Sequence, residues 1–277
     1  MVGDMENLFL TLATLCYGCG TVGYLVYLVR HWEGVHWVSW AVLLTGALVQ
    51  GGVLLARSFE QGHLAVTSSP EALSFLAWVL VVLYVVLQLK PGLRVLGSFV
   101  APLAVAFMLT SGLLPVHMAS RAGIFQSFWV FFHVSALFLA NGLFALAFSA
   151  GVMYLLQERQ IKTKQFGFLY PRLPSLKRLD EINFYCIVVG FPLMTAGLVA
   201  GFAYAGVIWH SWWNWDPKEI FAVVTWLIYA VLLHERLAVG WRGRRAAWLA
   251  IFGFSAVLIT LLGVNLLMKG HHTGFVR

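Results

Sequence analysis

Residues 184–237 read FYCIVVGFPLMTAGLVAGFAYAGVIWHSWWNWDPKEIFAVVTWLIYAVLLHERL, and they contain two long apolar runs. The runs are separated by residues 209–219, WHSWWNWDPKE, where aromatic and charged side chains gather. A helix needs about 20 mostly apolar residues to cross the hydrocarbon core of a bilayer. The two runs therefore predict two membrane-spanning helices joined by a short segment at the membrane surface.

Similar apolar runs recur along the whole chain. Of its 277 residues, 61% are hydrophobic and only 10% are charged, which excludes a soluble globular protein. The sequence predicts an all-α polytopic membrane protein. The first run lacks a small-residue cleavage site after it, so we expect a retained helix and not a signal peptide. The eight predicted spans cover roughly residues 7–29, 36–56, 71–90, 94–113, 129–156, 184–209, 219–237 and 246–268.

Basic residues between the spans predict the orientation of the chain. Positive side chains concentrate in the segments that follow the fifth and seventh spans, and such segments usually face the cytoplasm. This orientation puts 13 of the 18 Lys and Arg residues inside, and it puts both termini and residues 209–219 outside. The net charge of +7 therefore reports topology, and we expect no nucleic-acid partner.

The chain has three cysteines, Cys16, Cys19 and Cys186. Cys16 and Cys19 form a C-x-x-C pair, a spacing found in redox and metal sites. The pair lies inside the first predicted span with no histidine or third cysteine nearby, so we expect both to be buried packing residues.

Residues 209–219, called here the Trp segment, carry four tryptophans within seven positions. Indole rings suit a membrane boundary, and an aromatic belt is the simpler explanation for an isolated pair. This density favours a surface that contacts the faces of a large planar ligand. The tryptophans are Trp209, Trp212, Trp213 and Trp215.

The end of the Trp segment also predicts the start of a helix. Asp216 is suited to an N-cap, Pro217 to the first helical position, and Glu219 lies three residues after Asp216, as in a capping box. Lys218 could pair with an acidic group of a ligand, although an interfacial lysine is usually solvated.

Histidines near the predicted ends of spans are candidate metal ligands. An iron porphyrin needs one or two axial ligands, apolar walls and counter-charges for its propionates. His133 and His272 lie at the outer ends of two different spans, at the level of the Trp segment, as opposed axial ligands require. His234 lies near the inner boundary and is a weaker candidate. A histidine at a membrane rim is more often a solvated or capping residue.

These residues resemble the CcsA (ResC) family of system II cytochrome c biogenesis proteins, which belongs to the heme-handling proteins with a WWD domain. The resemblance covers roughly residues 60–275, and the Trp segment is its most specific part, with an Asp-Pro-Lys-Glu ending that favours CcsA over CcmC and CcmF. The matching pieces are Gly62-His63, residues 71–78, His133-Val134, residues 154–159, Leu179-Asp180, residues 190–193, Thr195, Gly197, the Trp segment, Trp226, Tyr229, His234 and residues 263–267.

The resemblance implies a function in the plasma (inner) membrane of a bacterium. With a CcsB (ResB) partner, such a protein exports heme b and presents it outside, where apocytochrome c attaches it through a Cys-x-x-Cys-His motif. The chain would be the CcsA subunit of a holocytochrome c synthase (heme lyase). Residues 1–128 would form an N-terminal four-helix region, and residues 129–277 a heme-handling core. A HemX-like regulator that binds heme without joining it to a protein is the alternative, and a ResB-like protein encoded beside the gene would argue against it.

The resemblance also implies ligand roles. His133 and His272 would bind the outer heme iron, and His234 would bind an iron at an inner site whose second ligand comes from the partner, with His36 a weak local candidate. Two positions depart from the family pattern. His210 stands where the family usually has glycine, and His271-His272-Thr273-Gly274 leaves open whether His271 or His272 is the second outer ligand.

Overall fold

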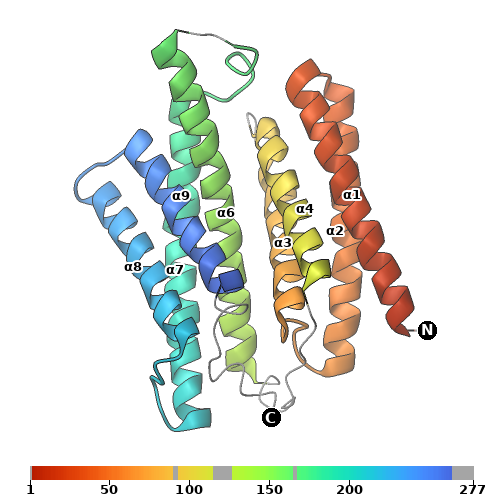
Figure 1. Cartoon of the computed structure of the whole chain (residues 1–277), viewed down its shortest axis with the longest axis vertical. Helices are drawn as coiled ribbons and strands as arrows, with labels where there is room; N and C mark the ends of the chain where they lie inside the picture. Colours follow the sequence, from red (N-terminus) through yellow and green to blue (C-terminus); the bar gives the residue numbers. More distant parts are fainter. Residues whose placement is uncertain (1, 90–92, 115–126, 165–166, 264–277) are drawn as a thin grey trace.

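A computed structural model describes residues 2–89, 93–114, 127–164 and 167–263. Within these ranges, eight helices are long and apolar enough to cross a membrane, which confirms the prediction of an eight-span all-α protein (Figure 1). The elements are α1 (Val2–Arg30), α2 (Glu33–Gln61), α3 (Ser69–Leu87), η1 (Arg94–Leu96), α4 (Gly97–Leu113), α6 (Phe128–Thr163), α7 (Leu176–Trp209), α8 (Pro217–Leu237), α9 (Arg244–Leu258) and the π-helical turn η2 (Ile259–Gly263).

Polar side chains at the helix starts explain where several spans begin. Ser68 caps α3 and forms a capping box with Glu71, and Ser175 caps α7 by accepting a hydrogen bond from the backbone of Arg178. These side chains satisfy backbone N–H groups that have no partner inside the helix. Because of its cap at Ser175, α7 begins eight residues before the apolar run that starts at residue 184.

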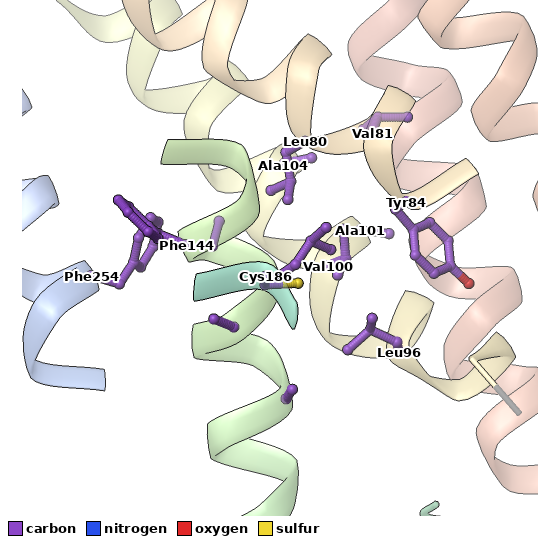
Figure 2. Close-up of a cluster of buried hydrophobic side chains, with 14 of the residues drawn as sticks. Leu80, Val81, Tyr84, Leu96, Val100, Ala101, Ala104, Phe144, Cys186 and Phe254 are labelled. Carbon is purple, nitrogen blue, oxygen red and sulfur yellow. The ribbon is translucent and has the colours of Figure 1, made fainter. Parts of the chain in front are cut away.

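Two groups of helices form the molecule, the N-terminal half (α1–α4) and the C-terminal half (α6–α9) (Figure 1). A continuous core of buried side chains connects them. Figure 2 shows part of this core, with side chains from α4 (Val100 and Ala104), α6 (Phe144), α7 (Cys186) and α9 (Phe254). All five side chains are less than 6% exposed, so the two halves share one packed interior.

The helices alternate in direction, and this sorts the connecting segments between two ends of the molecule. The start of α1, the turn between α2 and α3, and the Trp segment lie at one end, at the bottom of Figure 1. The connections that carry most of the basic residues, between α6 and α7 and between α8 and α9, lie at the opposite end. We call the first of these the Trp end and the second the basic end.

The cysteines of α1 differ from the prediction. Cys16 is half-buried and its β-carbon faces Gly46 of α2, as a packing residue would, but Cys19 is exposed on the helix surface. The two residues are three positions apart, about 300° around the helix, so α2 covers only one of them. The expectation that both are buried is therefore wrong for Cys19.

Candidate functional site at the Trp end

His133 lies in the second turn of α6, and its imidazole is held by a defined hydrogen bond. Nδ1 is 2.7 Å from the carbonyl oxygen of Gly197 in α7. A carbonyl oxygen only accepts, so Nδ1 carries the proton. In the neutral ring Nε2 then has a free lone pair, and it has no partner among the described residues. A histidine that binds a metal typically has this tautomer, with its other ring nitrogen donating to a carbonyl or carboxylate oxygen.

Glycines of α7 allow the His133 ring to approach so closely. A β-carbon at Gly201 would lie 2.5 Å from both Nδ1 and Cε1 of His133, and one at Gly197 would lie 2.9 Å from Leu137. No real β-carbon fits at the first distance, so only glycine at position 201 leaves room for the ring. The backbone of α7 therefore forms the floor on which His133 is fixed.

The Trp segment folds back onto the same part of α7. The ring of Trp212 lies over Gly206, where a β-carbon would be 3.2 Å from the indole. The Trp213 ring is 5.8 Å from that of Phe202 and 5.6 Å from that of Trp215. Trp212 and Trp215 are 70% and 75% exposed, so large aromatic faces are open to a ligand or a partner.

Two buried carboxylates fix the turn from the Trp segment into α8. Asp216, 2% exposed, caps α8 and accepts a hydrogen bond from the backbone of Lys218 at 2.8 Å. Glu219 accepts from the backbone of Asn214 at 2.9 Å and completes the capping box. The predicted helix start is confirmed. Both carboxylates accept hydrogen bonds from the backbone of the protein itself, and Lys218 beside them is half-buried.

Left-handed backbone at two positions gives the segment its shape. His210 ends α7 with a φ of 53°, and Trp215 precedes the N-cap with a φ of 57°. Glycine adopts this conformation most easily, and it is strongly preferred at the position after a helix. His210 therefore stands at a position whose left-handed backbone favours glycine, the residue that the family usually has there.

Several expected site residues lie outside the described residues. They are His271 and His272, together with the side chain of Trp209, whose backbone ends α7. The described part of the site thus brings together His133, Trp212, Trp213 and Trp215 along a single stretch of α7. Lys218 belongs to the adjoining start of α8.

His234 is not part of this arrangement. It lies in the last turn of α8, at the basic end, about 25 Å along the helix from Pro217. Its side chain is exposed, on a face that also exposes Val224, Leu227 and Val231. His36 lies in α2, in the other half of the molecule, and its ring is buried between Tyr24 and Tyr27. His36 and His234, the weak candidate pair for an inner iron, thus lie in different halves of the molecule.

A buried ion pair fixes the end of α8 next to His234. Arg236 donates to both carboxylate oxygens of Asp180 at 2.9 and 2.7 Å, and the backbone of Gly243 donates to the same carboxylate at 2.8 Å. The Arg236 side chain is 6% exposed. Residue spacing gave no sign of this contact because the partners are 56 positions apart. It ties α7, α8 and the start of α9 together.

Other residues of the recognised motifs have structural contacts. Trp226 donates from its indole nitrogen to the Thr195 hydroxyl at 2.9 Å and stacks on Phe191. Tyr229 stacks on Phe144 with centroids 3.6 Å apart and is fully buried. These contacts join α8 to α7 and α6, so they position the helix that follows the Trp segment.

The sequence of the chain is similar to those of known proteins. A family model described as cytochrome C assembly protein matches residues 66–272. The chain is 31% identical to a cytochrome c biogenesis protein CcsA of Guillardia theta over 276 residues, covering 90% of this chain and 92% of the relative. It is 35% identical to the CcsA of Heterosigma akashiwo over 257 residues, covering 80% of each. The chain belongs to the CcsA family of system II cytochrome c biogenesis.

A solved structure shares the fold of this CcsA-family chain at low sequence identity. It is the cytochrome c heme lyase CcmF, with a TM-score of 0.66 and 16% identity. The match covers 97% of this chain and 47% of the CcmF chain, so the CcsA-family chain spans about half the length of that neighbour. The two proteins therefore share a common arrangement of helices.

Proposed function

We propose that this chain exports heme b across the membrane and presents it at the Trp end for covalent attachment to apocytochrome c. The observation that carries the proposal is the bond from His133 Nδ1 to the Gly197 carbonyl, which leaves Nε2 free. His133 binds the heme iron through Nε2 in this reading. His272, which lies outside the described residues, supplies the second axial ligand, with His271 the alternative.

The Trp segment provides the surface for the porphyrin. Exposed Trp212 and Trp215 contact the planar face of heme, and Trp213 packs between Trp215 and Phe202. Trp209 belongs to this surface by its position in the sequence. Lys218 pairs with a propionate, and Asp216 keeps the segment at the start of α8 through its cap.

The chain needs no nucleophile of its own for the attachment. Cysteine thiolates of the Cys-x-x-Cys-His motif are the nucleophiles that react with the heme vinyl groups. The chain holds the iron, keeps the vinyl edges accessible, and yields one axial position to the histidine of the substrate. In this scheme the chain is the CcsA subunit of a holocytochrome c synthase, in the plasma membrane of a bacterium with the Trp end outside.

His234 belongs to an inner site that receives heme from the cytoplasmic side. Its side chain is exposed on α8, so a ligand from another polypeptide can approach it. The apolar face around it, with Leu227 and Val231, suits a membrane partner of CcsB (ResB) type. The Asp180–Arg236 pair fixes the helix end that carries the histidine.

Maturation of a cytochrome tests the proposal. The chain, a ResB-type partner and an apocytochrome with the Cys-x-x-Cys-His motif are produced in a bacterium without its own maturation system. Covalent heme is then detected on the denatured cytochrome in a gel. We expect attachment with wild type and its loss with His133→Ala, while an apocytochrome with both cysteines replaced by serine stays without heme. Heme binding by the chain without any attachment would contradict the synthase role and favour a HemX-like regulator.

A further inference from the structure

A cavity with a volume of about 560 Å³ lies at the basic end, away from the Trp segment. It opens between the N-terminal half and the beginning of α7. The residues that line it come from α1, from η1, from the segment before α7 and from the first turn of α7: Tyr27, Arg94, Val95, Arg172, Leu173, Pro174, Ser175 and Arg178. We call it the arginine cavity.

Among the described residues, the lining of the arginine cavity carries three positive charges and no acidic side chain. Arg94 pairs with Glu33, and Arg178 pairs with Glu181 at 3.4 Å, so carboxylates outside the cavity offset two of the charges. Arg172 donates to the carbonyl oxygen of Phe168 at 3.0 Å and stacks on its ring. Arg172 has no carboxylate partner among the described residues, so the wall of the cavity is net positive.

Further hydrogen-bond donors face the same space. Tyr27 lines the cavity, and its side chain is only 5% exposed. Its phenolic hydroxyl can donate a hydrogen bond to a polar group bound in the cavity. Ser175 puts the N-terminus of the 34-residue helix α7 at the cavity, where the helix dipole also favours an anion.

The depth of the cavity identifies the kind of anion. The fourth and sixth candidate membrane spans begin at Arg94 and Leu176, so the cavity lies at the level where apolar helix meets water. Val95 and Leu173, 7% and 6% exposed, provide apolar surface beside the arginines. A soluble anion gains nothing from this apolar surface. The phosphate of a phospholipid matches the arginines, and its glycerol backbone matches the apolar surface beside them.

We propose that the arginine cavity binds the headgroup of an anionic phospholipid. Arg94, Arg172 and Tyr27 donate to the phosphate, and the acyl chains leave along the apolar surface. Because these residues come from both halves of the molecule, the bound lipid also joins the N-terminal half to the start of α7.

Native mass spectrometry of the detergent-purified protein tests the site, with phosphatidylglycerol and phosphatidylcholine as probes. The test variant is Arg94→Gln with Arg172→Gln. The matched control is Arg159→Gln with Arg242→Gln, which removes the same charge from exposed side chains outside the cavity. We expect wild type and the control to bind phosphatidylglycerol at least about tenfold more tightly than phosphatidylcholine, and the test variant to lose this preference. Arg172→Gln alone, which breaks no ion pair with a carboxylate, should lose part of it.

Two results would overturn the proposal. Equal affinity of wild type for the two lipids would show that the cavity does not select an anionic headgroup. Displacement of phosphatidylglycerol by excess inorganic phosphate, with the same loss in the test variant, would show a site for a free anion and not for a lipid. Elution of each variant as a single folded species in size-exclusion chromatography is required before its affinity is compared.

Discussion

Gly201→Ala is the substitution that most directly tests how His133 is held. The new β-carbon would lie 2.5 Å from Nδ1 and Cε1 of the imidazole, whereas ordinary contact needs about 3.5 Å. The ring must therefore move about 1 Å away from α7. The bond to Gly197, now 2.7 Å long, then exceeds the range of a good hydrogen bond, about 3.2 Å.

The energies of the Gly201→Ala change can be compared with one another. Loss of the hydrogen bond costs about 0.5–1.5 kcal/mol and overpacking about 1–3 kcal/mol, against a gain of about 1 kcal/mol from alanine in a helix. A net loss of stability of about 0.5–3.5 kcal/mol remains. Without its bond to the carbonyl, Nδ1 no longer fixes the tautomer, and heme affinity should fall by about 10- to 100-fold.

Heme titration followed by visible absorption, together with thermal unfolding, measures both effects. The matched control is Gly52→Ala in α2, where a β-carbon meets no heavy atom within 4 Å. The control should bind heme as wild type does and should unfold at the same or a higher temperature. If Gly201→Ala behaves like the control in both assays, the ring of His133 does not rest on α7 and the reasoning is refuted.

Three further substitutions test the surroundings of the site by thermal unfolding. Arg236→Gln leaves the carboxylate of Asp180 without its ion-pair partner and should destabilise the protein by about 3–5 kcal/mol. Lys162→Gln, which breaks an exposed ion pair, should cost less than about 0.5 kcal/mol. Equal losses of stability in the two variants would contradict a larger contribution from the buried pair. Asp216→Ala should destabilise the protein by about 0.5–2 kcal/mol, and Asp216→Asn by much less, because asparagine also caps a helix. Unchanged stability in Asp216→Ala would exclude the cap as a stabilising contact. Tyr229→Phe should be neutral or stabilising by about 1 kcal/mol, because the buried Tyr229 hydroxyl has no hydrogen-bond partner among the described residues, and a clear loss of stability would reveal a partner.

Features that depend on neighbouring residues in the chain were predictable from the sequence. The eight spans follow from the length of each apolar run, and the start of α8 follows from Asp216, Pro217 and Glu219. The concentration of tryptophans in the Trp segment needs no structure to be seen. In each case the physical cause, burial in lipid or capping of a helix end, acts over a few turns at most.

Features that depend on how the helices are rotated against each other were not predictable. His133 could be named as a candidate, but its bond to Gly197 joins residues 64 positions apart. The Asp180–Arg236 pair and the arginine cavity likewise form only once α7 has a fixed neighbour on each side. Cys19 shows the same limit, because apolar surroundings in the sequence do not say which face of α1 is covered.

The measurement that tests the central claim most directly is the visible spectrum of the reduced, detergent-purified protein after heme is supplied. Wild type is compared with His133→Ala, and with His63→Gln as a second histidine near the Trp end. We predict a bis-imidazole heme b spectrum for wild type and His63→Gln, a weakened one for His133→Ala, and its recovery when imidazole is added. The same spectrum in His133→Ala and wild type without imidazole, or no heme binding by wild type, would contradict the assignment of His133 as an iron ligand.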